Sequence, residues 1–228
     1  MDNNKEDWPI GRQRFDISKM PYRMRKLPVL RGYPVPWFVA MVDGQYDFRI
    51  ADAQKLKQAV LGRLCWLCGE SLGHYLAFVV GPMCTINRVS SEPPSHRGCA
   101  EFSVTVCPFL LDQEHHRRDD NLPEDITEPA GQFIKRQPGV IVVWTCRDYV
   151  LVNDGDKPLF KMGEQTELSW WRQGRSATHE EVLLAINTGF PILEAAARAD
   201  GPQALRQLEA QLAVALKLVP AESSKEKP

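Results

Sequence analysis

Two short cysteine motifs constrain the fold of this chain more than any other feature. CWLCGESLG spans residues 65–73 and HRGC spans residues 96–99, so each motif holds two metal-binding side chains three positions apart. A CxxC turn places two sulphurs on one side of a tight knuckle, and Gly69 permits the backbone bend that follows. In the first turn of a helix, residues three apart share a face, and the positive helix end favours thiolate. Together the motifs can close a tetrahedral metal site.

We predict one structural zinc ion with four protein ligands, namely Cys65, Cys68, His96 and Cys99. Four protein ligands leave no open position for water or substrate, so this zinc would hold the fold together rather than catalyse hydrolysis. Cys84 is the rival fourth ligand in place of His96. Cys107 lies about two helical turns beyond Cys99, which is too far for the same ion.

Two other interpretations of the cysteines stay open. Free cysteine packs well as a small apolar residue, so the motifs can also be buried thiols without metal. A redox dithiol is the second alternative, but such motifs follow a strand and open a helix. Here residues 52–64 predict a helix before Cys65, with Asp52 as its N-cap. That order favours the metal site.

Composition and charge limit the classes of partner. Hydrophobic residues make up 43% of the 228 residues and charged residues 25%, which is typical of a soluble globular protein. The formal net charge is −1, so attraction to nucleic acid must come from a local patch. No apolar run approaches the ~20 residues of a membrane-spanning helix, and the polar N-terminus lacks a signal peptide. We therefore expect a cytoplasmic protein with reduced cysteines and no membrane contact.

The residue pattern predicts an α+β fold with a treble-clef-like zinc core, made of a knuckle, a β-hairpin and a helix. Asp43-Gly44 lies between two β-prone runs and predicts a hairpin further upstream. Gly81-Pro82 divides the apolar segment 75–89 into two short strands, which we expect to be the hairpin of the zinc core. A helix then begins at the HRGC motif and continues through Val106.

The C-terminal half is expected to contain strands followed by helices. Three apolar runs after residue 139 predict two or three antiparallel strands, and Trp170-Trp171 is interpreted as core packing beside a helix end. THEE at residues 178–181 fits a capping box. We expect its helix to be interrupted at residues 189–191 and a last helix to begin near Pro202. The predicted ranges are a disordered 1–11, a zinc-centred domain with a basic arm over 12–112, an exposed connector over 113–131, strands and helices over 132–220, and a disordered tail over 221–228.

A basic arm precedes the zinc motifs. Residues 12–31 contain one acid, Asp16, and seven basic residues, which are Arg12, Arg14, Lys19, Arg23, Arg25, Lys26 and Arg31. Prolines favour an extended path here, and aromatic residues lie among the cations. Because Lys and Arg neutralise phosphates and aromatic faces stack on bases, the arm is the predicted nucleic-acid surface. The alternative is an arm that lies across the domain and pairs with its acidic surface.

A binding or regulatory protein is favoured over an enzyme, with a protein partner or an inhibitor module as the alternative to nucleic acid. The enzymatic alternative places a site near Asn87, Arg88 and His96, as in an HNH-like metal-dependent nuclease. Such nucleases need a histidine on the hairpin to activate water, and residues 75–89 contain none. The loop 87–92 is either an anion or partner site, or it caps a helix and bonds to itself.

Three segments resemble a family of uncharacterised bacterial and phage proteins. They are MPYRMRKLPVLRGYPVPWFVAMVDG, CWLCGESLG and GPMCTINRVSSEPPSHRGCAEFSVTVCPFL. The similarity extends from about residue 20 through the C-terminal helices. The family has no established activity, so the resemblance implies shared zinc ligands and a shared fold, and little about biochemistry.

Overall fold

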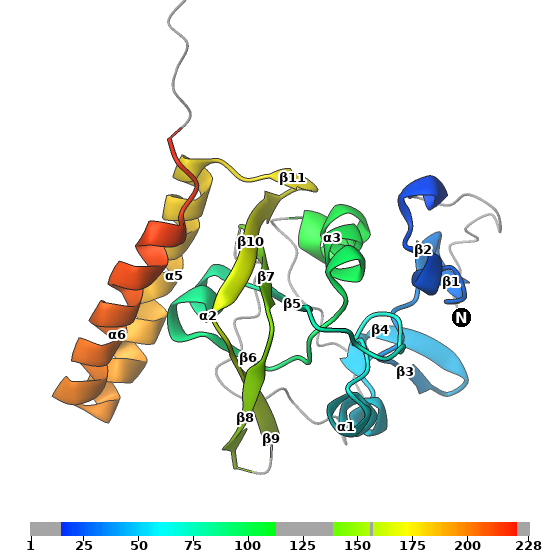
Figure 1. Cartoon of the computed structure of the whole chain (residues 1–228), viewed down its shortest axis with the longest axis horizontal. Coiled ribbons are helices and arrows are strands. Elements are labelled where there is room, and N and C mark those ends of the chain that lie inside the picture. The colour runs from blue at the N-terminus through cyan, green and yellow to red at the C-terminus, as the bar shows by residue number, and fades with distance from the viewer. Residues whose placement is uncertain (1–14, 113–138, 156, 223–228) are drawn as a thin grey trace, which may run out of the picture.

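The computed structural model describes residues 15–112, 139–155 and 157–222. Within these ranges the chain is an α+β protein, and all its strand pairs are antiparallel (Figure 1). The expected disordered N-terminus and connector lie outside the described residues, as does the expected tail apart from residues 221 and 222.

The central sheet has the strand order β11-β10-β7-β5. Its members are β5 (Leu76–Val80), β7 (Ile141–Cys146), β10 (Gln165–Arg172) and β11 (Arg175–Ser176). All six residues of β7 are buried, because helices cover both of its faces. A smaller sheet has the order β6-β9-β8, from Val89–Ser90, Lys157–Met162 and Tyr149–Asp154 respectively. Both of these sheets take strands from the two predicted ranges, 12–112 and 132–220, so the two ranges share these sheets.

Alternation along β7 separates two layers of core. Val142 and Trp144 point to the face covered by α2 (Pro82–Asn87), α5 (His179–Asp200) and α6 (Pro202–Ala215), while Ile141 and Val143 point to α3 (Arg97–Val106). Figure 1 shows this layering, with α5 and α6 on one side of the central sheet and α3 on the other. The helix from the HRGC motif and the last helix near Pro202 are as the sequence predicts.

The N-terminal region holds short elements. They are the 3-10 helices η1 (Ile17–Lys19) and η2 (Tyr22–Met24), the strand pairs β1 (Val29–Leu30) with β2 (Tyr33–Pro34) and β3 (Val39–Val42) with β4 (Gln45–Ala51), and α1 (Ala53–Gly62). The Asp43-Gly44 hairpin is confirmed, and both turn residues have positive φ, 49° and 78°. Asp52 caps α1 by accepting from the amides of Gln54 and Lys55. A short α4 (Pro108–Leu111) follows α3, and η3 (Leu216–Leu218) follows α6.

The expected hairpin over residues 75–89 is wrong. β5 pairs with β7, residues 82–87 form α2, and β6 pairs with β9. A short apolar run does not distinguish a strand from a buried helix by periodicity. Pro82 suits the first position of a helix, and α2 buries Met83 and Ile86, three positions apart, in the core.

The expected interruption at residues 189–191 is also wrong, because α5 continues through Pro191 to Asp200. The lost hydrogen bond is offset by packing, since Val182 and Ile186 on this helix are buried in the core. Its predicted capping box at Thr178 is confirmed. By length and composition α5 passes as a candidate membrane span, with a mean hydropathy of 1.2 and 28% of that window buried. Val182 and Ile186 on its buried face pack in the core.

The tryptophan pair lies in strand β10, so the expected helix end beside it is wrong. Core packing is confirmed for Trp170, which is buried and donates its indole N–H to the carbonyl of Leu218 at 2.9 Å. Trp171 lies on the other face of the sheet, packed against the layer that includes α3. A strand alternates its side chains between two faces, which explains how both rings become covered.

Candidate metal centre

Three cysteines and one histidine form a cluster that can hold a metal ion. Their ligand atoms all lie within 4.8 Å of one another, and the members are Cys65, Cys68, His96 and Cys99. The knuckle between β-bridged Leu64 and Ser71 supplies the first two, and the N-cap and first turn of α3 supply the last two. Cys84 lies on α2 and is not part of the cluster, so His96 is the residue that accompanies the three sulphurs.

The distances within the cluster suit a tetrahedral ion. His96 Nδ1 lies 3.4 Å from the Sγ of Cys68 and 4.0 Å from the Sγ of Cys99. Around zinc, with bond lengths of about 2.3 Å to sulphur and 2.0 Å to nitrogen, neighbouring ligand atoms lie about 3.5 to 3.8 Å apart. These two distances are close to those of a tetrahedral coordination shell.

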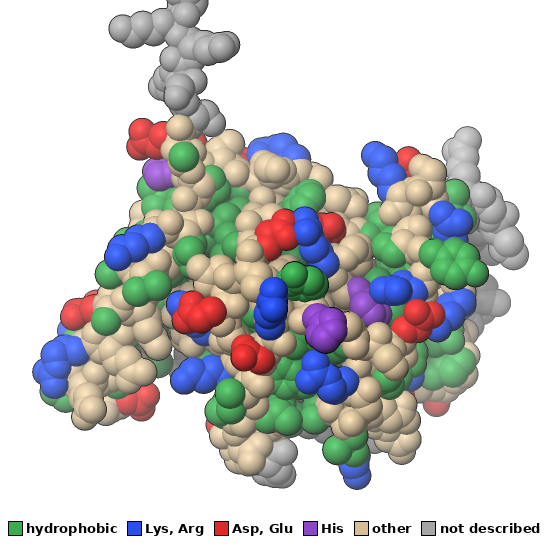
Figure 2. Space-filling view, in the orientation of Figure 1, with side chains coloured by type: hydrophobic (Ala, Val, Ile, Leu, Met, Phe, Trp, Pro, Cys, Tyr) green, Lys and Arg blue, Asp and Glu red, His purple; other side chains and the backbone are tan. Residues whose placement is uncertain are grey.

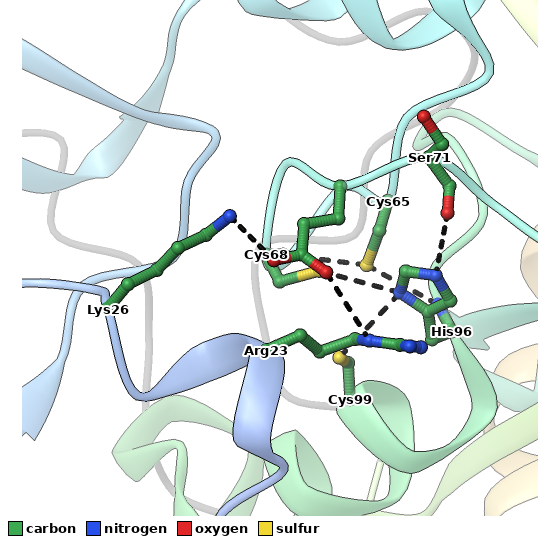
Figure 3. Close-up of polar contacts among 8 residues, drawn as sticks. Arg23, Lys26, Cys65, Cys68, Ser71, His96 and Cys99 are labelled. Atoms are coloured by element: carbon green, nitrogen blue, oxygen red, sulfur yellow. Dashed lines mark hydrogen bonds and ion pairs between the residues drawn. The ribbon is translucent and has the colours of Figure 1, made fainter.

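His96 is oriented by a second hydrogen bond. Its Nε2 lies 3.0 Å from the carbonyl oxygen of Ser71, so this nitrogen carries the proton and donates it (Figure 3). The other ring nitrogen, Nδ1, then faces the sulphurs. Metal-binding histidines usually donate their other ring nitrogen in this way, which fixes the tautomer and the ring orientation.

Backbone amides surround the sulphur of Cys65. It accepts hydrogen bonds from the amides of Cys68 at 3.4 Å and His96 at 3.3 Å. Gly69 makes the turn possible, with φ of +74° and an amide that donates to the Cys65 carbonyl at 2.8 Å. A Cβ at this glycine would lie 2.6 Å from the Trp37 ring. The knuckle geometry therefore needs glycine at this position for both conformation and space.

The four side chains share protons in a way that favours a cation. Hydrogen bonds from Cys68 and Cys99 hold the pKa of Cys65 well below its ordinary value, which makes it the thiolate of the group. The sulphurs of Cys65 and Cys68 raise the pKa of His96 to about 10. Hydrogen bonding to the same two sulphurs also raises the pKa of Cys99. A divalent ion can replace the shared protons and balance the negative charge of the thiolates that their loss leaves.

The basic arm lies across the cluster. Met20 and Met24 are buried at 4% and 2% exposure in the same core as the three sulphurs, with Phe102 of α3. Five predicted nucleic-acid-binding residues are exposed there, namely Lys19, Arg23, Arg25, Lys26 and Arg31. The other two, Arg12 and Arg14, lie outside the described residues. The expected extended path is wrong at residues 17–19 and 22–24, where η1 and η2 form, while Met20 between them is extended.

One acid on the knuckle pairs with the arm. Glu70 Oε1 lies 2.7 Å from Lys26 Nζ, and Glu70 Oε2 lies 3.5 Å from Arg23 Nε. Lys26 and Arg23 hold the pKa of this carboxyl below its ordinary value, with Lys26 as the main cause. The alternative interpretation of the arm, pairing with the acidic surface of the domain, therefore applies to these two cations.

Residues of the alternative enzymatic site have structural partners. The Asn87 side chain accepts from the amide of Val89 at 3.0 Å. Arg88 has φ of 57°, pairs with Glu164, and places its guanidinium 5.6 Å from the Trp144 ring centroid. Further along, the Ser90 hydroxyl donates to the Glu92 carbonyl. This loop bonds to itself and to the core, as the alternative interpretation of residues 87–92 predicts.

The sequence reasoning missed two residues that complete the centre. Ser71 orients His96 through its carbonyl, and Glu70 joins the knuckle to the arm. An acid directly after a CxxCG motif, in a chain with a basic segment upstream, is the signal that points to Glu70. Backbone carbonyls carry no sequence signal, so the role of Ser71 emerges only from the fold.

No protein-family model, no curated protein and no solved structure matches this chain. The assignment of a metal centre accordingly depends on the positions of the four side chains and their hydrogen bonds. The shared packing of the arm and the cluster connects the centre to the exposed cations of the arm.

Proposed function

We propose that this chain is a zinc-stabilised binding protein whose basic arm contacts nucleic acid. One structural zinc ion would be bound by Cys65, Cys68, His96 and Cys99, in a treble-clef-like arrangement of knuckle and helix start. Three thiolates and one imidazole suit zinc, and Cys3His is a common structural zinc set. Reduced thiols require a reducing compartment, which supports a cytoplasmic location. The resemblance to bacterial and phage proteins belongs to the same proposal.

The zinc ion would act by joining three segments that are distant in sequence. The knuckle provides two ligands, helix α3 provides the third sulphur, and the arm packs on the cluster through Met20 and Met24. Between the two ligand pairs, where a treble clef has a β-hairpin, this chain has strand β5 and helix α2. The ligand arrangement supports the treble-clef-like part of the proposal, and the intervening elements differ from it.

The observation that carries the nucleic-acid proposal is the outward display of cations on an anchored arm. Met20 and Met24 are buried in the core, whereas their neighbours Tyr22, Arg23, Arg25 and Lys26 are exposed to solvent. Tyr22 among them is 87% exposed, and an exposed aromatic ring beside cations is suited to stacking on a base. Figure 2 shows Lys and Arg side chains over this region, on the right.

The test is salt-dependent binding to a fluorescent single-stranded oligonucleotide, followed by anisotropy. We expect binding at low salt with a logarithmic slope of about −0.7 per phosphate contact. The triple reversal R23E, R25E and K26E should abolish it. As a matched control, R198E, R206E and K217E reverse three exposed cations on α5, α6 and η3 and should leave it unchanged.

Two results would contradict the proposal. If the wild-type protein does not bind at low salt, the arm is not a nucleic-acid surface, and a protein partner becomes the better explanation. If the control reversal weakens binding as much as the arm reversal, the attraction is a general charge effect. Metal-dependent cleavage of the oligonucleotide would instead favour the enzymatic alternative.

A further inference from the structure

We infer that Arg23 and Lys26 form a phosphate-binding site, and that the Glu70 carboxylate occupies this site in the unbound protein. Glu70 would then compete with the phosphate for the same two cations and set the affinity of the arm. The inference rests on the proposed function for its ligand, a phosphodiester of nucleic acid. The same chemistry also admits free phosphate, and the experiment below separates the two.

The carboxylate of Glu70 holds the position that a phosphate would take. One of its oxygens accepts from Lys26 Nζ at 2.7 Å, and the other lies 3.5 Å from Arg23 Nε. Figure 3 shows the two cations converging from the arm on one carboxylate. Two adjacent oxygens of a phosphate present a similar pair of acceptors, and Arg and Lys are the residues that bind them in proteins.

Both sides of this contact are held in place by the fold. The Glu70 carbonyl accepts from the Cys65 amide at 2.7 Å, so the acid is fixed by the knuckle itself. Arg23 lies in η2 beside the buried Met24, and the amide of Leu27 donates to the Met24 carbonyl at 3.0 Å across the turn that carries Lys26. The backbone that carries the two cations is therefore held in place before a ligand arrives.

The contact is nevertheless open to exchange. The side chains of Arg23, Lys26 and Glu70 are 46%, 58% and 40% exposed. Exposed ion pairs contribute little net stability, so a phosphate from solution can replace the carboxylate at small cost. Tyr22 lies next to Arg23 in the chain and is 87% exposed, which leaves a ring available for a base beside the phosphate.

The test compares E70Q with E194Q. Both variants remove one negative charge, and Glu194 pairs with Arg198 on α5, away from the arm. We expect E70Q to bind the oligonucleotide about threefold to tenfold more tightly than wild type, because two cations lose their internal partner. Its salt slope should steepen, since more counterions are released on binding. E194Q should match wild type, and all three proteins should have equal zinc content and unfolding midpoints.

Inorganic phosphate is the second probe, followed through the NMR shift of the Arg23 Nε–H group. A larger phosphate response in E70Q than in E194Q, with no oligonucleotide binding by either, supports the site and contradicts the proposed nucleic-acid function. Wild-type oligonucleotide binding that E70Q leaves unchanged overturns the inference and leaves the proposed function standing. No response of E70Q to either probe overturns both.

Discussion

The sheet core and the sulphur core of this protein bury different kinds of side chain. The sheet core, around β5, β7 and β10, includes large residues with almost no exposure, such as Trp144, Phe78 and Phe160. The sulphur core lies between the arm, the knuckle and α3. Its buried members are Met20, Met24, Cys65, Leu67, Cys68, Cys99, Phe102 and Val106.

This difference indicates how each region is stabilised. Burial contributes about 25 cal/mol for each Å² of apolar surface, so large residues on two faces of a sheet can support a fold without a cross-link. The sulphur core has short elements and three cysteines among its eight buried residues. Small regions of this kind usually need a metal or disulfides. We therefore expect the sulphur core to depend on its ion and the sheet core to be independent of it.

Removal of a metal ligand should have the largest effect. Structural zinc contributes about 10 kcal/mol or more of apparent binding free energy in small domains. We expect Cys65→Ser or Cys99→Ser to lose the metal and to unfold the arm and knuckle, while β7 keeps its protected amides. Elemental analysis, expected to give about one zinc per wild-type chain, and hydrogen exchange measure the two effects.

The matched control for the ligand variants is Cys84→Ser. Cys84 lies on α2 outside the cluster, and burial raises the pKa of its thiol to about 11. This variant should keep the metal, which also tests the rival ligand that the sequence left open. A metal-free protein with normal protection of the arm would contradict the proposed role of the ion.

Truncating a side chain in the sheet core should lower the stability of the fold without removing the metal. Phe160 is fully buried and its ring packs against Phe78 and Tyr149. We expect Phe160→Ala to lower the free energy of unfolding by about 3–5 kcal/mol, through lost burial and a cavity. The folded fraction should still carry one zinc per chain, as measured after gel filtration. Loss of the metal from folded protein would show that the two cores are not separable.

A smaller effect is expected from the knuckle glycine. Gly69→Ala adds a Cβ 2.6 Å from the Trp37 ring and imposes positive φ on alanine, so we expect about 1–3 kcal/mol of strain at the site. Zinc should be released at a lower chelator concentration than from wild type. Gly73→Ala is the control, because no atom lies within 4 Å of its added Cβ. Equal zinc retention in the two variants would mean that the knuckle does not set the affinity.

Local signals made parts of the fold predictable from the sequence. Asp52 capping α1, the Asp43-Gly44 hairpin and the Thr178 capping box each depend on residues within a few positions. The cysteine cluster joins residues that are 28 and 31 positions apart, yet it was found because metal binding demands particular residue types at a fixed spacing.

The parts that could not be predicted depend on distant partners. β5 is a strand because β7 pairs with it more than 60 residues later, whereas residues 82–87 form the helix α2 and bury Met83 and Ile86. α5 continues through Pro191 because its neighbours bury one face. Glu70 and Lys26 are 44 positions apart, so an acid after CxxCG and a basic segment upstream do not by themselves show which two side chains pair. Tertiary packing decides all three, so local propensity fails there.

The smallest predicted effect concerns charge in the sheet region. Arg175 and the Thr178 amide hold the pKa of Glu181 at about 2, against an ordinary value of 4.5, and the carboxylate also pairs with Arg172. A carboxyl whose pKa is lower in the folded than in the unfolded state stabilises the fold at pH values above the unfolded-state pKa. That contribution is lost as the pH falls towards the folded-state pKa. E181Q should therefore cost about 1 kcal/mol at pH 7 and progressively less from pH 4.5 to pH 2.

Urea unfolding of E181Q, wild type and E194Q at several pH values measures this difference. Acid would also protonate thiolates and release a metal ion bound at the sulphur core, but that loss would be common to all three proteins and would cancel in the comparison. E194Q removes the same charge from the same helix. The difference in unfolding free energy between E194Q and wild type should not shrink between pH 4.5 and pH 2 as it does for E181Q. A constant gap between E181Q and wild type down to pH 2 would assign its cost to lost packing instead of lost charge.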